Sequence, residues 1–249
     1  MAAYYIVLDL EMNPVSESCW CDSNGLRRET IEIGAIKIDA GTNQIVDEFT
    51  CVVKPQFNHR IEPKITRLTG ISTGEVKTAN TFGTAFSDFV DWIGREEARI
   101  YSWSPSDYSQ LRKECSAKQI DFPEELLDWV DFQAEYPKYL GYSQNRCFSL
   151  KDAANLIGTT VIPGRAHRAL YDAQVTAKLV LFALTEEYKH YTSRICDVMD
   201  RTHDTMTYSI GDACGSKLAA LLARMNTGEE REVPQYGTER RGATPAFVR

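Results

Sequence analysis

The sequence lacks the long apolar segments that membrane insertion and export require. No apolar run approaches the ~20 residues of a membrane-spanning helix. The first residues, MAAYYIVLDLEMN, contain no basic region followed by a long apolar stretch. With 43% hydrophobic and 10% aromatic residues among 249, the chain can still bury a substantial core. We therefore expect a soluble, unexported, cytoplasmic protein that does not associate with a membrane.

A dense set of cysteines is absent, and the cysteine pattern is unlike that of a disulfide framework. The seven cysteines are odd in number and scattered over a long chain, whereas secreted disulfide scaffolds are short and dense in cysteine. Cys19 and Cys21 form a C-x-C pair. No second pair supplies the remaining ligands of a structural zinc site, which takes about four. The sequence thus favours reduced thiols, with Cys19 and Cys21 in an exposed loop.

An excess of positive charge is also absent. The net charge is −7, whereas nucleic-acid-binding domains are usually basic. The average conceals two basic strips. Residues 59–68, HRIEPKITRL, hold three Lys or Arg and one His, and residues 164–168, GRAHR, hold two Arg and one His. An acidic protein with such strips is compatible with phosphate contacts, especially where a metal neutralises its carboxylates.

Hydrophobic periodicity predicts strands first, and then strands that alternate with helices. Five strands are predicted, at residues 4–10, 31–39, 44–53 and 98–103 and at the end of 126–132. Four helices are predicted, at residues 82–93, from about 105, at 149–158 and at 167–190. This order predicts an α/β fold with a mixed five-stranded sheet flanked by helices, and a site where strand ends meet helix starts.

The C-terminal part of the chain differs in character from the rest. Residues 1–190 form the predicted folded domain, and residues 191–249 form a tail. The segment GSKLAALLARMN favours one short amphipathic helix within this tail. The last two dozen residues have almost no apolar periodicity, which is typical of disorder.

Two carboxylates interrupt the first predicted strand near its end. Asp9 and Glu11 are two residues apart, so their side chains share one face of a regular strand. Adjacent anions repel each other, and this raises the pKa of one unless a cation compensates. The pair alone therefore leaves three readings open, namely a metal, a shared proton or plain solvent exposure at a strand end.

Three further residues narrow these readings. Asp107 follows the strand at 98–103, and His167 and Asp172 lie at the start and on the second turn of the predicted last helix. Taken singly, each fits a capping or surface role. Together with the first pair they form four carboxylates and one histidine, a set that suits two Mg²⁺ or Mn²⁺ ions and a general base. The sequence thus favours metal-assisted hydrolysis of a phosphodiester.

The same segments resemble a known family. VLDLEMN, IEIGAIKID, HRIEPKITRLTGIS, WSPSDYSQL and GRAHRALYDAQVTAKL are similar, in this order, to the motifs of the DEDDh 3′-to-5′ exonucleases. This proofreading-exonuclease superfamily has a ribonuclease H-like fold. The resemblance covers about residues 4–188. Within the group, the motifs most resemble the histone-mRNA and small-RNA 3′ exonucleases and their bacterial KapD-like relatives.

The resemblance implies roles for the five catalytic candidates. Asp9, Glu11 and Asp172 would hold the first metal ion, and Asp9 would bridge to the second. Asp107 would reach the second ion directly or through water. His167 would be the general base. Two divalent ions, Mg²⁺ or Mn²⁺, are the implied cofactors.

The resemblance also implies substrate contacts. Six residues would contact the terminal nucleotide, namely Leu10, Met12, Ile65, Thr66, Leu68 and Thr69. Arg165 and Arg168 are our own candidates for phosphate contacts, with solvated surface charge as the alternative. Glu32 matches a family position and either positions the surroundings of Glu11 or is a buried structural acid.

Two functional hypotheses follow from the sequence. The first is an exonuclease that shortens single-stranded nucleic acid, RNA rather than DNA, and releases nucleoside 5′-monophosphates. The second is a nucleic-acid-binding or regulatory module without turnover. The loss of a metal-binding carboxylate would have favoured the second, and all four are present. A protein partner that docks on the tail is compatible with the sequence but is not indicated by it.

Overall fold

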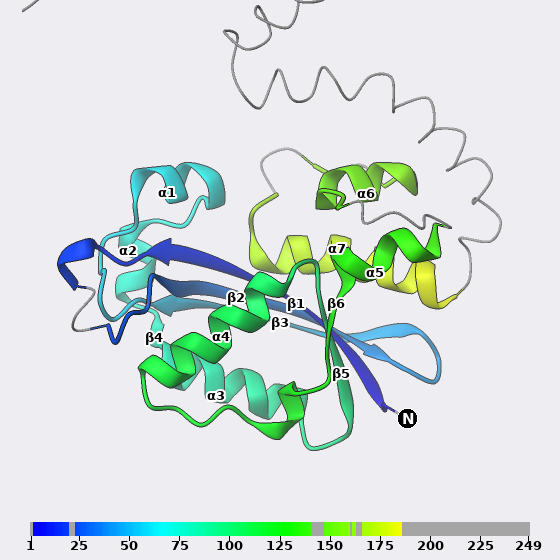
Figure 1. The fold of residues 1–249 in the computed structure, drawn as a ribbon, viewed down its shortest axis with the longest axis horizontal. Helices are drawn as coiled ribbons and strands as arrows, with labels where there is room; N and C mark the ends of the chain where they lie inside the picture. Colours follow the sequence, from blue (N-terminus) through cyan, green and yellow to red (C-terminus); the bar gives the residue numbers. More distant parts are fainter. Residues whose placement is uncertain (1, 20–22, 141–146, 160, 163–165, 186–249) are drawn as a thin grey trace, which may run out of the picture. The chain divides into compact units, whose positions relative to one another are not determined.

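A six-stranded mixed sheet forms the centre of the fold (Figure 1), with strand order β4-β3-β2-β1-β5-β6. The strands are β1 (Tyr4–Pro14), β2 (Arg28–Asp39), β3 (Gln44–Lys54), β4 (Asn80–Thr81), β5 (Ala98–Ser102) and β6 (Trp129–Asp131). β1, β2 and β3 pair in antiparallel fashion, whereas β5 and β6 continue from β1 in parallel and β4 is parallel to β3. β1 is therefore the central strand at which the pairing changes from antiparallel to parallel.

The computed structural model describes residues 2–19, 23–140, 147–159, 161–162 and 166–185. The described helices are α1 (Pro63–Thr69), α2 (Thr73–Lys77), α3 (Phe82–Ile93), α4 (Pro105–Ala117), α5 (Phe132–Tyr139), α6 (Leu150–Leu156) and α7 (Ala169–Leu184). Two short 3-10 helices span Glu17–Cys19 and Glu124–Leu126. The domain boundary expected near residue 190, and the helix and disorder expected in the tail, lie outside the described residues.

Side-chain alternation assigns the two faces of the sheet to different helices. Ile6, Leu8 and Leu10 of β1 join one hydrophobic core with residues of α3 and α4. The residues between them face the opposite side, where α7 packs against β1 and β2 (Figure 1). α3 begins at its cap Thr81, whose side chain accepts the backbone N–H of Thr84, and it ends before Gly94, which has a φ of 84°. Its apolar stripe faces the core as predicted.

The predicted α/β fold is confirmed, and the strand count needs correction. The sheet has six strands rather than five, because β4 adds two residues that pair with the end of β3. A two-residue strand has no periodicity that a sequence pattern can reveal. The short fifth strand expected at the end of residues 126–132 is β6.

The last helix begins later than its predicted start. α7 spans Ala169–Leu184, whereas the sequence predicts a helix over residues 167–190, of which residues 186–190 lie outside the described part of the chain. His167 has a φ of 64°, in the left-handed region, so it precedes the helix instead of starting it. Asp172 consequently lies in the first turn of α7 and not in the second.

The remaining expectations concern the cysteines and membrane-spanning helices. Cys51, Cys115 and Cys147 are free thiols, and Cys19 is half-buried rather than in an exposed loop. Cys21 lies outside the described residues. Within the described part of the chain, no helix has the length and apolar character needed to cross a bilayer.

Candidate active site

Asp9 and Glu11 lie where β1 loses one of its two neighbours. β1 continues to Pro14, so the two carboxylates are within the strand and not at its end as expected. Pairing with β5 stops at Leu8, opposite Ser102, while pairing with β2 continues. Asp9 is paired with Gly34 and Glu11 with Glu32, so both carboxylates are on the face that α7 covers. The two carboxylates therefore lie just beyond the point at which β1 stops pairing with β5.

Asp107 occupies the place beside β1 that β5 vacates. It lies in the first turn of α4, directly after the connection from β5, and it is only 4% exposed. Its own backbone N–H, the backbone N–H of Leu10 and the Ser104 side chain lower the pKa of this carboxyl group, against the larger effect of burial. The influence of Leu10 places the start of α4 beside the strand between Asp9 and Glu11. Asp107 thus joins the first pair as the sequence predicted.

A close approach between β2 and α7 brings the last two predicted residues to the same place. A Cβ atom on Gly34 would lie 2.1 Å from the backbone nitrogen of Leu170, so only glycine allows this contact. Just before α7, the backbone N–H of His167 donates to Asp172 Oδ2 at 3.0 Å. This bond closes the turn at His167 and fixes the Asp172 carboxylate at the helix start.

Glu32 holds the start of α7 against the sheet. It is 1% exposed and accepts the backbone N–H of Ala169 at 2.8 Å. It also accepts hydrogen bonds from two nitrogen atoms of the Arg168 guanidinium, and the bond from Nε is 3.0 Å long. Glu32 is thus a buried structural acid that caps α7. Through α7 it positions His167 and Asp172, so both readings left open by the sequence describe part of its role.

Burial and crowding raise the pKa of all four carboxyl groups. Burial is the main cause for each of them, and it raises the pKa of Glu11 to about 8 and that of Asp107 to about 7. The pKa of Asp9 is raised further by Asp107, Asp172 and Glu11, in that order. The pKa of Asp172 is also raised, although the backbone and charge of His167 oppose the shift. The site therefore favours either protons or cations among its carboxylates.

The donor set fits divalent cations. One ligand atom from each of Glu11, His167 and Asp172 lies within 4.8 Å of the other two. The carboxylates of Asp9 and Asp107 both interact electrostatically with Glu11, and Asp9 also interacts with Asp172. Arg168, whose charge lowers the pKa of Glu11, is itself paired with Glu32. An oxygen-rich anionic set of this kind selects Mg²⁺ or Mn²⁺. The same geometry allows the His167 imidazole to act as a ligand or as a base.

The residues predicted to contact substrate have different surroundings. The Leu10 side chain is 6% exposed within the core, which leaves its backbone for contact. Met12 is partly buried against the same core. Thr69 is 4% exposed, and its hydroxyl donates to the carbonyl of Ile65 within α1. Leu68 is 46% exposed. Of this set, Leu68 is the residue with a large apolar surface open to solvent.

The remaining predicted contacts are only partly described. Ile65 packs against the small core of Ile31, Ile61, Ile71 and Val76, and Thr66 is half-buried. Arg165 lies outside the described residues. The side chain of Arg168 is 41% exposed and pairs with Glu32, so a phosphate would share this guanidinium with a carboxylate. None of these contacts is tested by the structure, and they stay predictions.

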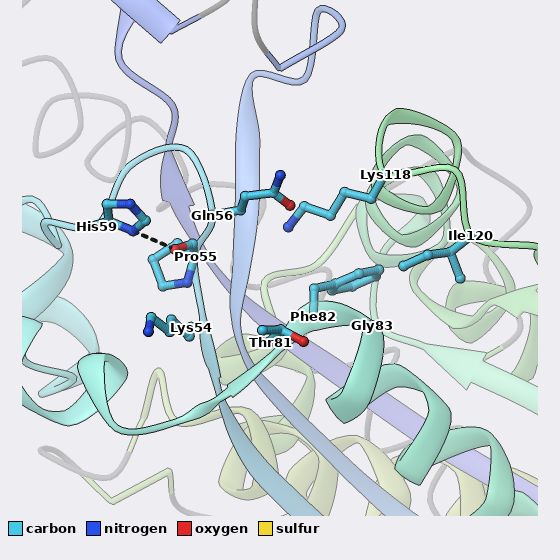
Figure 2. Close-up of a pocket in the computed structure, with 9 residues that line it drawn as sticks. All are labelled: Lys54, Pro55, Gln56, His59, Thr81, Phe82, Gly83, Lys118 and Ile120. Carbon is cyan, nitrogen blue, oxygen red and sulfur yellow. Dashed lines mark hydrogen bonds between the residues drawn. The ribbon is translucent and has the colours of Figure 1, made fainter.

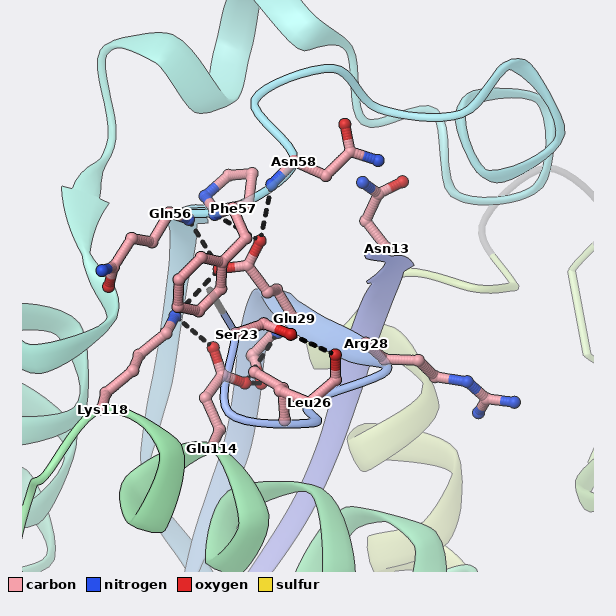
Figure 3. Close-up of polar contacts among 12 residues, drawn as sticks. Asn13, Ser23, Leu26, Arg28, Glu29, Gln56, Phe57, Asn58, Glu114 and Lys118 are labelled. Carbon is pink, nitrogen blue, oxygen red and sulfur yellow. Dashed lines mark hydrogen bonds and ion pairs between the residues drawn. The ribbon is translucent and has the colours of Figure 1, made fainter. Parts of the chain in front are cut away.

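Sequence reasoning missed a buried polar network beside the site (Figure 3). Glu29 in β2 is 0% exposed and accepts the backbone N–H groups of residues 56–58 together with Lys118 Nζ. Asn13, also 0% exposed, accepts the N–H of Glu62 at 3.0 Å and donates to the carbonyl of Arg60 at 3.2 Å. Most of these bonds join a strand residue to a loop that is distant in sequence, so no local pattern signals them. They fix the loop before α1 next to the end of β1.

A cavity of about 400 Å³ is lined in part by this loop (Figure 2). It is lined by Lys54, Pro55, Gln56, His59, Thr81, Phe82, Gly83, Lys118 and Ile120. His59 Nδ1 donates to the carbonyl of Pro55 at 2.9 Å at one edge of it. None of the five catalytic candidates lines this cavity, so it is separate from the carboxylate site.

Comparison with known sequences gives one family and several relatives. The Exonuclease family (RNase_T) matches residues 6–180. The ERI1 exoribonuclease 2 of Danio rerio is 26% identical over 205 residues, which cover 74% of this chain and 35% of that protein. The 3′-5′ exonuclease Snipper of Drosophila melanogaster is 26% identical over 219 residues, which cover 76% and 75% of the two chains. The chain thus spans about a third of the length of the ERI1 exoribonuclease 2 relative.

Comparison with solved structures gives the fold. The nuclease domain of 3′hExo, a DEDDh family member bound to rAMP, aligns with a TM-score of 0.63 at 22% identity and covers 74% of this chain and 93% of that domain. Cell-death related nuclease 4 aligns with a TM-score of 0.61 at 20% identity, covering 74% and 64%. The ribonuclease H-like fold expected from the sequence is therefore confirmed.

Proposed function

We propose an activity that starts from the family: this chain belongs to the Exonuclease family (RNase_T) and is a DEDDh-type member with a ribonuclease H-like fold. It hydrolyses single-stranded nucleic acid from the 3′ end and releases nucleoside 5′-monophosphates. The observation that carries this proposal is the convergence of four carboxylates and His167 at the break beside β1. Their raised pKa values suit a site that binds cations during its reaction cycle.

Each residue of the site has a defined task in this proposal. Asp9, Glu11, Asp107 and Asp172 would hold two divalent ions, Mg²⁺ or Mn²⁺. Ions bound there would activate the attacking water and stabilise the leaving oxygen. His167 would accept the proton of that water as general base, because its exposed imidazole lies beside Glu11 and Asp172. Glu32 and Arg168 keep the start of α7 in place, so that the base and Asp172 stay aligned.

RNA is the proposed substrate in preference to DNA. The support comes from relatives that are named exoribonucleases, including 3′-5′ exoribonuclease 1 of Homo sapiens, which is 23% identical over 167 residues. A protein that distinguishes the two nucleic acids does so by contact with the 2′-hydroxyl group. A cytoplasmic location belongs to the same proposal, and the free thiols of Cys51 and Cys115 support it.

A degradation assay tests the proposed function. Single-stranded RNA and DNA of equal sequence, each labelled at the 5′ end, are incubated with wild-type protein and Mg²⁺, Mn²⁺ or a chelator. We expect a ladder that shortens stepwise from the 3′ end, needs a divalent ion and forms faster on RNA.

Two variants complete the degradation assay. Asp9→Ala should give no ladder, whereas Asp91→Ala, which changes an exposed acid of α3, should behave like wild type. Intact oligonucleotide that stays tightly bound under all conditions would contradict turnover and favour a binding module.

A further inference from the structure

A basic segment, residues 54–67, lies at the edge of the candidate active site. It contains four Lys or Arg and a single Glu in a chain of net charge −7. It runs from the end of β3 through the loop before α1 and includes most of that helix. A local positive charge on an acidic protein indicates a surface for an anionic partner, because the rest of the protein repels such a partner.

Hydrogen bonds to neighbouring residues fix the loop in this segment. Glu29 accepts the N–H groups of residues 56–58 at 2.6 to 3.0 Å (Figure 3). Asn58 Nδ2 donates to the carbonyl of Pro14 at 2.8 Å, and the N–H of Ile61 donates to Thr73 Oγ1 at 3.0 Å. The loop is thus held in one conformation without using its basic side chains, and a ligand would meet a preorganised surface.

Three basic side chains of the segment remain available. Arg60, Lys64 and Arg67 are exposed. In the part of the chain that the structure describes, the ion pairs involve other bases, and none includes these three. Lys64 and Arg67 are three residues apart in α1, so they share its outer face. Arg60 precedes the helix by three residues and extends the same basic surface toward β1.

The segment lies directly beside the carboxylate site. Asn13 is two residues beyond Glu11 in β1, and it bonds to the carbonyl of Arg60 and the N–H of Glu62. A strand whose 3′ end lies at the carboxylates would therefore have Arg60 and then α1 as near neighbours for its preceding phosphates. The carboxylate site itself needs cations and repels phosphates, so an adjacent basic surface would offset this repulsion.

We propose that Arg60, Lys64 and Arg67 bind the phosphates of the nucleic-acid strand upstream of the scissile bond. The partner is single-stranded nucleic acid, and the contacts are to its backbone, so they do not depend on base sequence. This inference rests on the proposed function, which places the 3′ end at the carboxylates. It predicts that long substrates gain affinity from α1, whereas a dinucleotide that fills only the carboxylate site gains far less.

A binding experiment with a matched control tests the inference. The triple variant Arg60→Gln, Lys64→Gln and Arg67→Gln removes three charges from the segment. The control is the triple variant Arg95→Gln, Lys113→Gln and Lys178→Gln, which removes three exposed charges elsewhere. Fluorescence anisotropy is measured with a labelled RNA dodecamer in the presence of a chelator, over a series of salt concentrations, and a short-substrate assay uses a dinucleotide with Mg²⁺.

The segment variant should differ from the control in two ways. It should bind the dodecamer roughly tenfold more weakly at about 50 mM salt. Its slope of log affinity against log salt should fall by about 2, because each phosphate contact on a single strand contributes about 0.7. Its loss of kcat/KM should be clearly larger on the dodecamer than on the dinucleotide. Circular dichroism and thermal unfolding establish that both variants fold.

The results separate this inference from the function on which it rests. Equal affinity and equal salt slope for the two triple variants would overturn the inference, even if wild type shortens RNA. If wild-type protein hydrolyses neither the dodecamer nor the dinucleotide in the presence of metal, the proposed function fails first. A loss of the same size on both substrates would show that the segment acts at the 3′ nucleotide, and that too would overturn the inference.

Discussion

Glu11 makes the metal-free protein sensitive to pH in a direction that can be measured. Burial raises the pKa of its carboxyl group to about 8, and Asp172, Glu32 and Asp107 contribute to the increase. In the unfolded chain the group returns to its ordinary value of about 4.3. Between these values the folded protein holds a proton that the unfolded chain has released. The contribution of this proton to the free energy of unfolding is fully present below about pH 4, and it is lost as the pH rises to about 8.

The size of the effect follows from the two pKa values. At about 1.36 kcal/mol for each pKa unit, the difference sets an upper bound of roughly 5 kcal/mol. Solvent screening of the half-buried side chain reduces it to a few kcal/mol. For a chain of this length, 1 kcal/mol corresponds to about 2–4 °C in Tm. Removal of the Glu11 charge should therefore raise the Tm of the metal-free protein at pH 8 by roughly 5–10 °C.

Thermal unfolding in a chelator at pH 5, 6, 7 and 8 measures this effect. Glu11→Gln should flatten the fall in Tm that wild type shows over this range, and Glu62→Gln, which changes an exposed acid, should not. Mg²⁺ or Mn²⁺ should restore the Tm of wild type at pH 8 and stabilise Glu11→Gln much less, because one ligand is missing. If the curves of wild type and Glu11→Gln run parallel, the assigned burial and crowding at Glu11 are wrong.

Four further variants test how the start of α7 is held and what His167 does beside it. Gly34→Ala should lower the free energy of unfolding by about 1–3 kcal/mol or more, because its Cβ would lie 2.1 Å from the α7 backbone, and it should abolish most activity. The control is Gly74→Ala, where the nearest contact of the new Cβ is at 3.7 Å. Urea unfolding and an activity assay compare the two variants. Glu32→Gln should cost about 2 kcal/mol and slow turnover. Adding Arg168→Gln to Glu32→Gln should lower the free energy of unfolding little further, because the two side chains share one interaction. Additive losses in a double-mutant cycle would contradict this expectation. His167→Ala should lower kcat by roughly 10²–10⁴ while Mn²⁺ binding, measured by calorimetry, persists. Loss of Mn²⁺ binding would instead make His167 a ligand.

The main parts of the site are visible in the sequence because they follow from local rules. Strand periodicity places Asp9 and Glu11 on one face whatever the surroundings are. Asp107 follows a buried strand, and the ends of such strands gather site residues in α/β sheets. The structure brings these three residues and Asp172 together as predicted. Their proximity can be predicted because each residue is tied to the position of its element and not to details of packing; their catalytic and metal-binding roles stay predictions.

The supporting contacts are not visible in the sequence, for equally physical reasons. Glu32 binds Arg168 across 136 residues, and Glu29 reaches the loop at residues 56–58 across 27 to 29 residues. Such pairings depend on strand register and on the close packing of α7, which periodicity does not specify. Asn13 looks like a turn residue, yet it is fully buried and joins β1 to the segment before α1.

Local irregularities explain the errors in element boundaries. α7 starts at Ala169 because His167 has a positive φ, which a non-glycine residue rarely adopts and which no motif announces. α5 was not predicted; it contains Pro137, a residue that usually ends a helix.

Single-turnover release of a labelled 3′ nucleotide from RNA, with saturating Mg²⁺, tests the central claim most directly. The comparison is between wild type, Asp9→Asn and the surface control Asp91→Asn. Asp9→Asn keeps the shape of the side chain at the centre of the site but removes the charge that cations require. We predict release of nucleoside 5′-monophosphate by wild type and by Asp91→Asn, and loss of several orders of magnitude in rate for Asp9→Asn, with RNA binding retained. Release by Asp9→Asn at the wild-type rate would contradict the claim that this site is the metal-dependent catalytic centre.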